Sequence, residues 1–289
     1  MGNERKGPGE LPMLLGVMGD PISQTKSPAM HNAALQAVGM AGTYVPLHVR
    51  KERLEDAIRG IVALGYRGVN VTVPHKVDVM SYVDVIDEAA KEIGAVNTIV
   101  NDGGILTGYN TDGIGYIRSL KEEAVPDLSG KHVLVVGCGG AARGIVYALL
   151  QEKPASVIIV NRTVQKAQEL ADEWAHLGTI RCCGMEELAQ VFQNQHIDIV
   201  INTTSVGMYP KMDELPISAE LLLPHMVVSD LIYNPLKTEL LSRAESIGCR
   251  IHNGLGMFVY QGAYAFEYWT GRPAPIEAMR TVVLNSLQV

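Results

Sequence analysis

One residue of this chain that could do acid/base chemistry is a lysine that comes just after a predicted strand. Residues 68–76 read GVNVTVPHK, with valine at alternate positions 69, 71 and 73. That two-residue period is typical of a strand, and Pro74 cannot donate a hydrogen bond to a neighbouring strand. The pattern predicts a strand that stops at Pro74 and leaves Lys76 at its carboxyl end, where open α/β sheets bind ligands.

Three further polar clusters favour a site there over an ordinary surface lysine. They are Thr25 and Ser27 in QTKSP, Asn97 in GAVNT, and Asp112 in GYNTDG. A lysine and a carboxylate within hydrogen-bond reach can act together as an acid/base unit. Whether such a lysine abstracts the proton or stabilises alkoxide charge stays open. Each cluster also has a structural alternative, because hydroxyls and carboxylates before helices are common caps and asparagine suits turns.

Two histidines near these clusters, His31 and His75, are predicted to be structural and to fill hydrogen bonds near the site. Acid/base chemistry at this site needs no histidine if Lys76 serves as the acid/base group.

The elements that would position these residues alternate between strands and helices, which indicates an α/β fold. In the first part we expect strands at 14–18, 44–49 and 96–100, helices from Pro28, at 54–64 and at 87–93, and a turn at 101–104. This alternation implies a mostly parallel sheet. Twenty-nine glycines with only three phenylalanines agree with many tight strand-to-helix turns.

A second series starts after a helical connector at 113–123. Its apolar strands are expected at 132–136, 157–160, 197–201 and 226–230, and the chain after residue 253 is expected to be wholly helical and to pack on the first part. We therefore predict two lobes. An N-terminal α/β substrate domain spans 11–112 and is completed by helices 254–289, and a doubly wound, Rossmann-type dinucleotide-binding domain spans 113–253.

The first strand of the second series runs into a glycine-rich loop, GCGGAA at 137–142. This G-x-G-x-x-A pattern opens a predicted helix. Gly137 permits the tight turn, Gly139 lets the backbone approach a pyrophosphate, and Ala142 allows close packing of helix on strand. The preceding strand makes this a specific signal for a dinucleotide.

The residues after the second strand of that series favour NADP over NAD. NAD enzymes place an acidic residue there to bind the ribose hydroxyls, whereas this chain has Asn161, Arg162 and Thr163. Arg162 can clamp a 2′-phosphate, and Lys166 adds a second positive charge one helical turn later. The alternative is that both are ordinary solvated residues at the start of a helix.

Bulk properties exclude several other classes of protein. A net charge of −7 and a pI near 5.6 disfavour nucleic acid and anionic membranes as partners. The four cysteines have no C-x-x-C spacing, so neither a metal site nor a disulfide framework is expected. No stretch reaches the ~20 apolar residues of a membrane span, and we expect a cytoplasmic protein. Residues 1–10 are predicted to be a disordered lead-in.

The motifs together resemble the shikimate dehydrogenase family over residues 13–285. The matching segments are GDPISQTKSPAMHN at 19–32, NVTVPHK at 70–76, GAVNT at 94–98, NTDG at 110–113, the glycine loop with Asn-Arg-Thr, and GLGMFVYQ at 254–261. One position departs from the family pattern, because Thr25 stands where the family usually has serine.

The resemblance implies an NADP-dependent enzyme that reversibly reduces 3-dehydroshikimate to shikimate, on the route to chorismate and the aromatic amino acids. Lys76 and Asp112 would be catalytic, at the hydroxyl that is oxidised. The implied substrate-binding residues are Thr25 and Ser27 at the carboxylate, Asn97 and Gln261 at ring hydroxyls, and Thr72 and Tyr233. The implied cofactor-binding residues are Gly137, Gly139, Gly140, Ala141, Asn161, Arg162, Thr163, Lys166, Gly254 and Met257.

Two alternatives remain beside this reading. One is a quinate or dual quinate/shikimate dehydrogenase, since the extra methyl of Thr25 reshapes the carboxylate pocket. The other is a catalytically silent NADP-sensing protein, which would not need the Lys76/Asp112 pair. For Met257, simple core packing is an equal alternative. We expect a monomer or homodimer with a small-molecule substrate.

Overall fold

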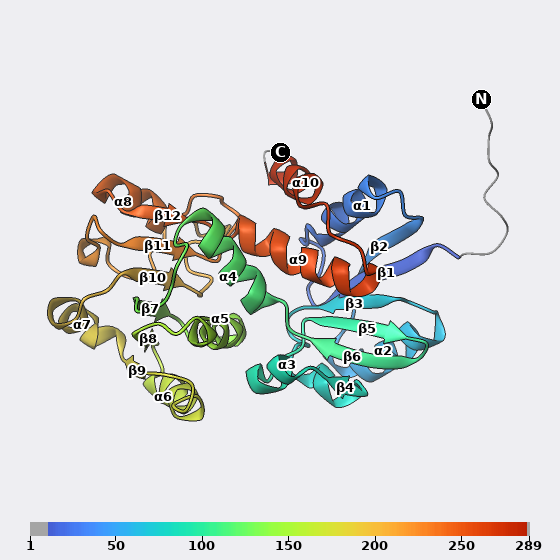
Figure 1. Cartoon of the computed structure of the whole chain (residues 1–289), viewed down its shortest axis with the longest axis horizontal. Helices are drawn as coiled ribbons and strands as arrows, with labels where there is room; N and C mark the ends of the chain where they lie inside the picture. The colour runs from blue at the N-terminus through green and yellow to red at the C-terminus, as the bar shows by residue number, and fades with distance from the viewer. Residues whose placement is uncertain (1–10, 288–289) are drawn as a thin grey trace.

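The computed structural model describes residues 11–287 and divides them into two lobes, each built on a six-stranded sheet (Figure 1). The lead-in predicted for residues 1–10 lies outside the described residues. Two long helices, α4 (Asp112–Glu123) and α9 (Leu255–Thr270), run side by side between the lobes. The two-lobed α/β fold predicted from the sequence is confirmed.

The first sheet is mostly parallel, with one reversed strand. Its strands, in spatial order, are β2 (Gly42–His48), β1 (Met13–Gly19), β3 (Gly68–Val71), β5 (Thr98–Asp102), β6 (Ile105–Tyr109) and β4 (Val85–Ile86). Strands β1, β2 and β3 are parallel, but β5 is antiparallel to both β3 and β6. The predicted mostly parallel sheet is confirmed except for β5, which runs in the opposite direction because the turn at 101–104 joins it to β6 in a hairpin.

Strand β3 is shorter than the valine pattern predicts. All four of its residues are buried, because it lies inside the sheet between β1 and β5 with both faces covered. The strand ends at Val71 instead of Pro74, and Val73 is 66% exposed. His75 N donates to Thr72 O at 2.9 Å, which closes a turn after the strand. Lys76 therefore belongs to a loop that starts at the carboxyl end of β3.

The second sheet is entirely parallel, as the doubly wound prediction requires. Its strands, in spatial order, are β12 (Arg250–His252), β11 (Val227–Asp230), β10 (Ile199–Asn202), β7 (His132–Val136), β8 (Ser156–Val160) and β9 (Ile180–Cys183). Each adjacent pair runs parallel. The sequence analysis missed β9 and β12. Both are short edge strands whose residues are partly exposed, so neither shows an unbroken apolar run.

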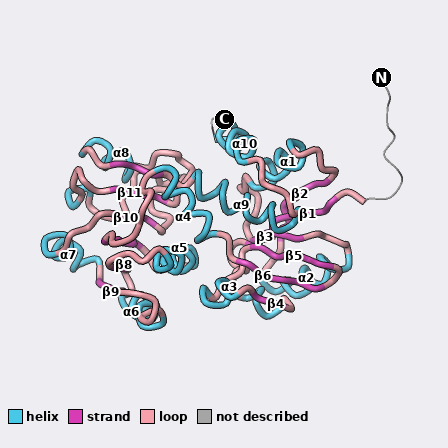
Figure 2. The backbone as a smooth tube through the Cα atoms, viewed as in Figure 1, coloured by secondary structure: helices cyan, strands magenta, loops and turns pink. Residues whose placement is uncertain are grey.

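Helices complete both lobes (Figure 2). The remaining α-helices are α1 (Ser27–Ala37), α2 (Leu54–Ala63), α3 (Glu88–Ile93), α5 (Gly140–Gln151), α6 (Val164–Glu173), α7 (Leu188–Asn194), α8 (Glu239–Ile247) and α10 (Ile276–Leu287). Short 3₁₀ turns occur at Lys51–Arg53, Asp78–Tyr82, Met185–Glu187 and Ala219–Leu221. None of the helices described in residues 11–287 is long and apolar enough to cross a membrane.

The C-terminal helices return to the first lobe. Phe266 and Trp269 of α9 are buried in the same core as Leu15 of β1, and α10 packs against α1. Trp269 Nε1 donates to Ile99 O of β5 at 2.9 Å. A Cβ on Gly68 would lie 2.2 Å from that nitrogen, so only glycine allows the indole to approach β3. The last helices thus fix the sheet whose strand ends carry the polar clusters.

Candidate active site

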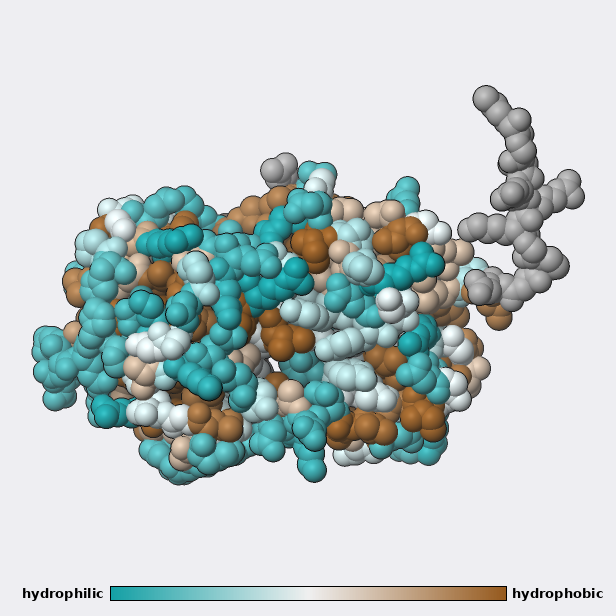
Figure 3. Space-filling view, in the orientation of Figure 1, coloured by the Kyte–Doolittle hydropathy of each residue, from teal (hydrophilic) through white to brown (hydrophobic). Residues whose placement is uncertain are grey.

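The polar clusters of the first lobe meet in a cavity of about 370 Å³ between the lobes. All eight residues predicted to be catalytic or substrate-binding line it: Thr25, Ser27, Thr72, Lys76, Asn97, Asp112, Tyr233 and Gln261. Gly254 and Met257, which were predicted to bind the cofactor, line this cavity as well. The face shown in Figure 3 is hollowed between the two lobes.

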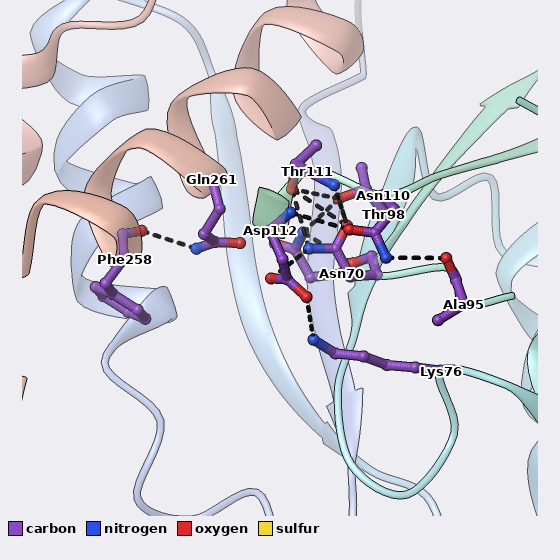
Figure 4. Close-up of polar contacts among 10 residues, drawn as sticks. Asn70, Lys76, Ala95, Thr98, Asn110, Thr111, Asp112, Phe258 and Gln261 are labelled. Atoms are coloured by element: carbon purple, nitrogen blue, oxygen red, sulfur yellow. Dashed lines mark hydrogen bonds and ion pairs between the residues drawn. The ribbon is translucent and has the colours of Figure 1, made fainter. Parts of the chain in front are cut away.

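Lys76 and Asp112 form an ion pair in this cavity (Figure 4). Lys76 Nζ donates to Asp112 Oδ2 at 2.6 Å, with the two side chains 23% and 11% exposed. The other carboxylate oxygen, Oδ1, accepts from Asn97 Nδ2 at 2.8 Å. Both oxygens of the carboxylate are thus fixed, and the ammonium keeps two further N–H donors for a ligand.

Asn97 is held by its neighbours and in turn orients the carboxylate. Its Oδ1 accepts from Thr111 N at 2.9 Å and from Thr98 Oγ1 at 2.9 Å, and its Nδ2 reaches Thr111 Oγ1 at 3.0 Å. The residue is only 3% exposed. These bonds and the one to Asp112 use most of the hydrogen-bond donors and acceptors of the Asn97 amide. Asn97 therefore also orients Asp112, a role that the sequence analysis did not predict.

The capping alternatives fail for two of the predicted residues. Ser27 and Asp112 are the first residues of α1 and α4, whose N-caps are Lys26 and Thr111, and neither cap makes a side-chain capping bond. Thr25 Oγ1 accepts from Ser27 N at 3.3 Å, which is a local turn before the helix. The hydroxyls of Thr25 and Ser27 therefore line the cavity at a helix N-terminus, a favourable place for an anion.

No lysine or arginine stands beside these two hydroxyls among the residues that line the cavity. Lys26 lies next to them in sequence, but its Nζ donates to Ser286 O at the end of α10. Lys76 is the one cationic side chain in the lining described here, and it is paired with Asp112. An anion at α1 would be bound by neutral donors.

The two histidines near the site are structural, but only one fills a hydrogen bond as predicted. His75 is buried, and its Nε2 lies 2.6 Å from Val49 O. Neither ring nitrogen of His31 has a hydrogen-bond partner among residues 11–287. His31 instead stacks on Tyr44 with ring centroids 4.4 Å apart, and burial lowers its pKa to about 3. Hydrogen bonding by His31 was wrongly predicted, because stacking cannot be read from local sequence.

A second cavity of about 480 Å³ lies at the carboxyl ends of β7, β8 and β10. Gly137, with φ of +104°, opens it, and a Cβ there would lie 2.8 Å from atoms of Thr203 and Thr204. Only glycine fits this turn. Helix α5 begins at Gly140, so its unpaired N–H groups follow the loop directly.

The structure brings some predicted cofactor residues into this cavity and leaves others beside it. Gly137, Gly139, Asn161 and Arg162 line it. Gly140 and Ala141 form the first turn of α5, whereas Thr163 and Lys166 stand at the start of α6 and are not among the lining residues. Lining residues that the sequence analysis missed include Met185, Leu215, Pro216 and the segment 203–206. That segment follows β10, so the strand-end rule could have found it.

One buried carboxylate connects the segments that line the two cavities. Asp230 Oδ1 accepts from Asn202 Nδ2 at 3.0 Å, and its Oδ2 accepts from Thr238 Oγ1 at 2.8 Å. Asn202 Oδ1 in turn accepts from Thr204 N at 3.0 Å. Burial raises the pKa of Asp230 to about 6. Asp230 thus ties the loop after β10, in the second cavity, to the chain that continues to Tyr233, in the first.

Three family models match successive parts of the chain. They are the shikimate dehydrogenase substrate binding domain at residues 17–99, shikimate / quinate 5-dehydrogenase at 119–209, and the shikimate 5'-dehydrogenase C-terminal domain at 254–284. A shikimate dehydrogenase (NADP(+)) of Geobacillus kaustophilus is 46% identical over 274 residues, which covers 94% of this chain and 98% of the relative.

Solved structures agree with the sequence comparison. A shikimate dehydrogenase in complex with NADP+ superposes with a TM-score of 0.90 at 42% identity, covering 96% of both chains. Shikimate 5-dehydrogenase of Thermus thermophilus in complex with NADP(H) and shikimate gives a TM-score of 0.86 at 33% identity, covering 95% of this chain and 100% of that one.

Proposed function

The chain belongs to the shikimate dehydrogenase family, and we propose that Lys76 and Asp112 move the proton in its reaction. It is an NADP-dependent oxidoreductase that reversibly reduces 3-dehydroshikimate to shikimate, a step toward the aromatic amino acids. The observation that carries the residue assignment is the 2.6 Å ion pair of Lys76 and Asp112 inside the interlobe cavity.

The proton chemistry follows from the ion pair. NADPH, when bound, supplies the hydride that reduces the ketone carbon. The Lys76 ammonium donates a proton to the ketone oxygen, so that C–H and O–H bonds replace the C=O π bond. Asp112 keeps the ammonium oriented and balances its charge, and Asn97 holds Asp112. In the oxidative direction Lys76 takes the hydroxyl proton back.

The remaining groups of the first cavity are proposed to orient the ring. Thr25 and Ser27, at the start of α1, bind the carboxylate through their hydroxyls. Thr72, Tyr233 and Gln261 lie around the same cavity and bind the other substrate oxygens. Gln261 is held by a 2.8 Å hydrogen bond from its Nε2 to Phe258 O, which leaves its Oε1 free to accept from a ring hydroxyl.

The second cavity fits a dinucleotide with a 2′-phosphate. The glycine turn brings backbone close to a pyrophosphate, and the α5 N-terminus offers unpaired donors. Arg162 lines the cavity where an NAD enzyme would carry an acidic side chain, and we assign it to the 2′-phosphate with Lys166 as an outer charge. Gly254 and Met257 border the first cavity and would face the nicotinamide end.

We assign substrate binding to residues 11–112 with helices 254–289, and cofactor binding to 113–253. Support comes from the distribution of the two cavities: the second is lined only by residues of 136–216, and the catalytic pair stands in the first lobe and at the start of α4. We further propose a cytoplasmic enzyme that works as a monomer or homodimer, without a nucleic-acid partner.

Isotope transfer tests the reaction directly. With 3-dehydroshikimate and NADPH deuterated at the transferred position of nicotinamide C4, the product should be shikimate with one deuterium on the former carbonyl carbon, seen by NMR. Product without deuterium at that carbon, or no product, would contradict the proposal.

A further inference from the structure

We propose that Arg143 is a positioning residue that holds the two lobes at the separation which hydride transfer requires. This inference rests on the proposed function. Arg143 lies in the first turn of α5, directly after the glycine loop, and its Nε donates to Ile93 O of the first lobe at 2.6 Å. Among residues 11–287, no other hydrogen bond or ion pair joins residues 11–111 directly to residues 130–253.

The first-lobe end of this contact is the last turn of α3. Ile93 is the final residue of that helix, so its carbonyl lacks an intrahelical partner, and a cation at a helix C-terminus is favourable. Gly94 follows with φ of +72°, and a Cβ there would lie 3.5 Å from the Arg143 guanidinium. Asn97, which orients Asp112, stands only three residues after Gly94. The contact is therefore made at the start of the short segment that leads to Asn97.

The second-lobe end of the guanidinium is fixed by α6. Its two terminal nitrogens donate to Glu173 Oε2 at 3.0 Å and Oε1 at 2.7 Å, and Arg143 Cζ lies 5.0 Å from the centroid of the Trp174 ring. Trp174 is fully buried. Helix α6 begins directly after Arg162 and Thr163, so the same side chain connects both helices that follow the cofactor-binding strands. The planar fork of arginine makes three directed bonds here that a lysine cannot reproduce.

Apart from this bond and the packing of α3 on α5 around it, the lobes are connected through α4 and α9 (Figure 2). A rotation about these helices would widen the interlobe cavity, and among residues 11–287 the Arg143–Ile93 bond is the one hydrogen bond directly between residues 11–111 and 130–253 that resists it. Removing that bond should leave each ligand able to bind its own lobe but place the reacting atoms too far apart. A misplacement of ~1 Å at a reacting centre can cost ~100-fold in rate.

The test compares Arg143→Met with Glu173→Gln, a matched control that keeps the Ile93 contact. In Arg143→Met we expect kcat for shikimate to fall roughly tenfold or more, with the Kd for NADP alone within about threefold of wild type. Glu173→Gln should keep kcat within about twofold, because its amide oxygen still accepts from the guanidinium and the bond to Ile93 O is unchanged. Arg143→Lys keeps the charge but loses the planar fork, so its kcat should lie between those of the other two variants. This variant replaces Arg143→Met in the comparison if Arg143→Met does not fold.

Two results would overturn the proposal. One is an unchanged kcat in folded Arg143→Met or Arg143→Lys. The other is a fall in kcat matched by an equal rise in the Kd for NADP, because that would show a local role in the glycine loop. X-ray scattering with both ligands bound gives an independent measure, in which Arg143→Met should be more extended than Glu173→Gln. Wild-type enzyme that fails to reduce 3-dehydroshikimate would instead reject the proposed function.

Discussion

The two cavities both lie at the carboxyl ends of strands, yet they are built from different parts of the chain. In the substrate cavity, polar side chains already bond to one another, as Lys76, Asp112 and Asn97 show. In the cofactor cavity, a glycine turn and a helix N-terminus supply backbone donors, and Arg162 makes no side-chain hydrogen bond or ion pair with any other residue of 11–287. The first is preorganised for chemistry, and the second presents charge to a ligand.

This contrast decides how each site should respond to substitution. Removing a member of the bonded cluster disturbs the groups that move a proton, so turnover should fall. Removing an unpaired charge leaves the protein intact and costs only its contact with the ligand, so affinity should fall. The following variants separate these outcomes.

The largest effect is expected for Lys76→Ala, which should lower kcat with shikimate by at least ~100-fold because a positioned proton-transfer group is lost. The fold should survive, since Asp112 keeps its bond to Asn97. Lys51→Ala is the matched control, because Lys51 is an exposed, ion-paired lysine of the same lobe outside the cavity. Near-wild-type turnover in a folded Lys76→Ala enzyme would reject the assignment.

The next largest effect concerns the cofactor. Arg162→Ala should raise the Kd for NADP by roughly ten- to a hundredfold and change that for NAD little, because a charge-assisted contact is worth ~1.5–3 kcal/mol. Arg181→Ala, on the neighbouring edge strand β9, provides the control. Equal weakening of NADP and NAD would show that Arg162 binds the shared pyrophosphate or supports the loop.

A smaller effect is expected at Thr25. Thr25→Val keeps the shape but loses the hydroxyl, so kcat/KM for shikimate should fall roughly tenfold. Thr25→Ser removes only a methyl and should change kcat/KM for shikimate only severalfold. The main change should be in the preference for shikimate over quinate. If valine performs as well as threonine with both substrates, the carboxylate is bound by Ser27 and other groups.

The smallest effect concerns stability. His31 is neutral in the folded protein because burial lowers its pKa to about 3, whereas the pKa of a histidine in the unfolded chain is near 6.5. The unfolded state therefore binds more protons between these values, and this contribution to stability is full above pH 6.5 and is lost as pH falls toward 3. His31→Phe should retain the stack on Tyr44 and make the free energy of unfolding less dependent on pH. Between pH 6 and 5, measured by urea unfolding, the wild type should lose about 1.4 kcal/mol more of this free energy than the variant.

The second lobe supplies the counterpart to that measurement. Asp230, with its pKa raised to about 6, binds more protons when folded, so its contribution to stability falls as pH rises from about 4 to 6. Asp230 thus opposes the histidine effect. A His31→Phe protein whose stability changes with pH as steeply as wild type would contradict the assignment.

Much of the site was predictable because it follows local rules. Strand β7 was predicted at its observed bounds, since five residues, four of them apolar, run directly into a glycine turn. Lys76 and Asp112 were found because each follows a strand, and parallel strands end at one edge. Asn97 directly precedes β5, and because β5 is antiparallel its amino end lies at that same edge. Contacts made by tertiary packing were not predictable. Arg143 bonds a carbonyl 50 positions away, and no local pattern announces it. The structural role of Asp230 likewise depends on two neighbouring strands ending together.

Initial rates of the wild-type enzyme with shikimate and quinate, each with NADP and NAD, test both halves of the comparison at once. The comparison of the two substrates probes the preorganised cavity of the first lobe, and the comparison of the two cofactors probes the unpaired charge of the second. We predict the highest kcat/KM for shikimate with NADP. This ratio should be lower when quinate replaces shikimate and when NAD replaces NADP. A rate with NAD equal to that with NADP would contradict the role of Arg162, and a preference for quinate would contradict the assigned substrate.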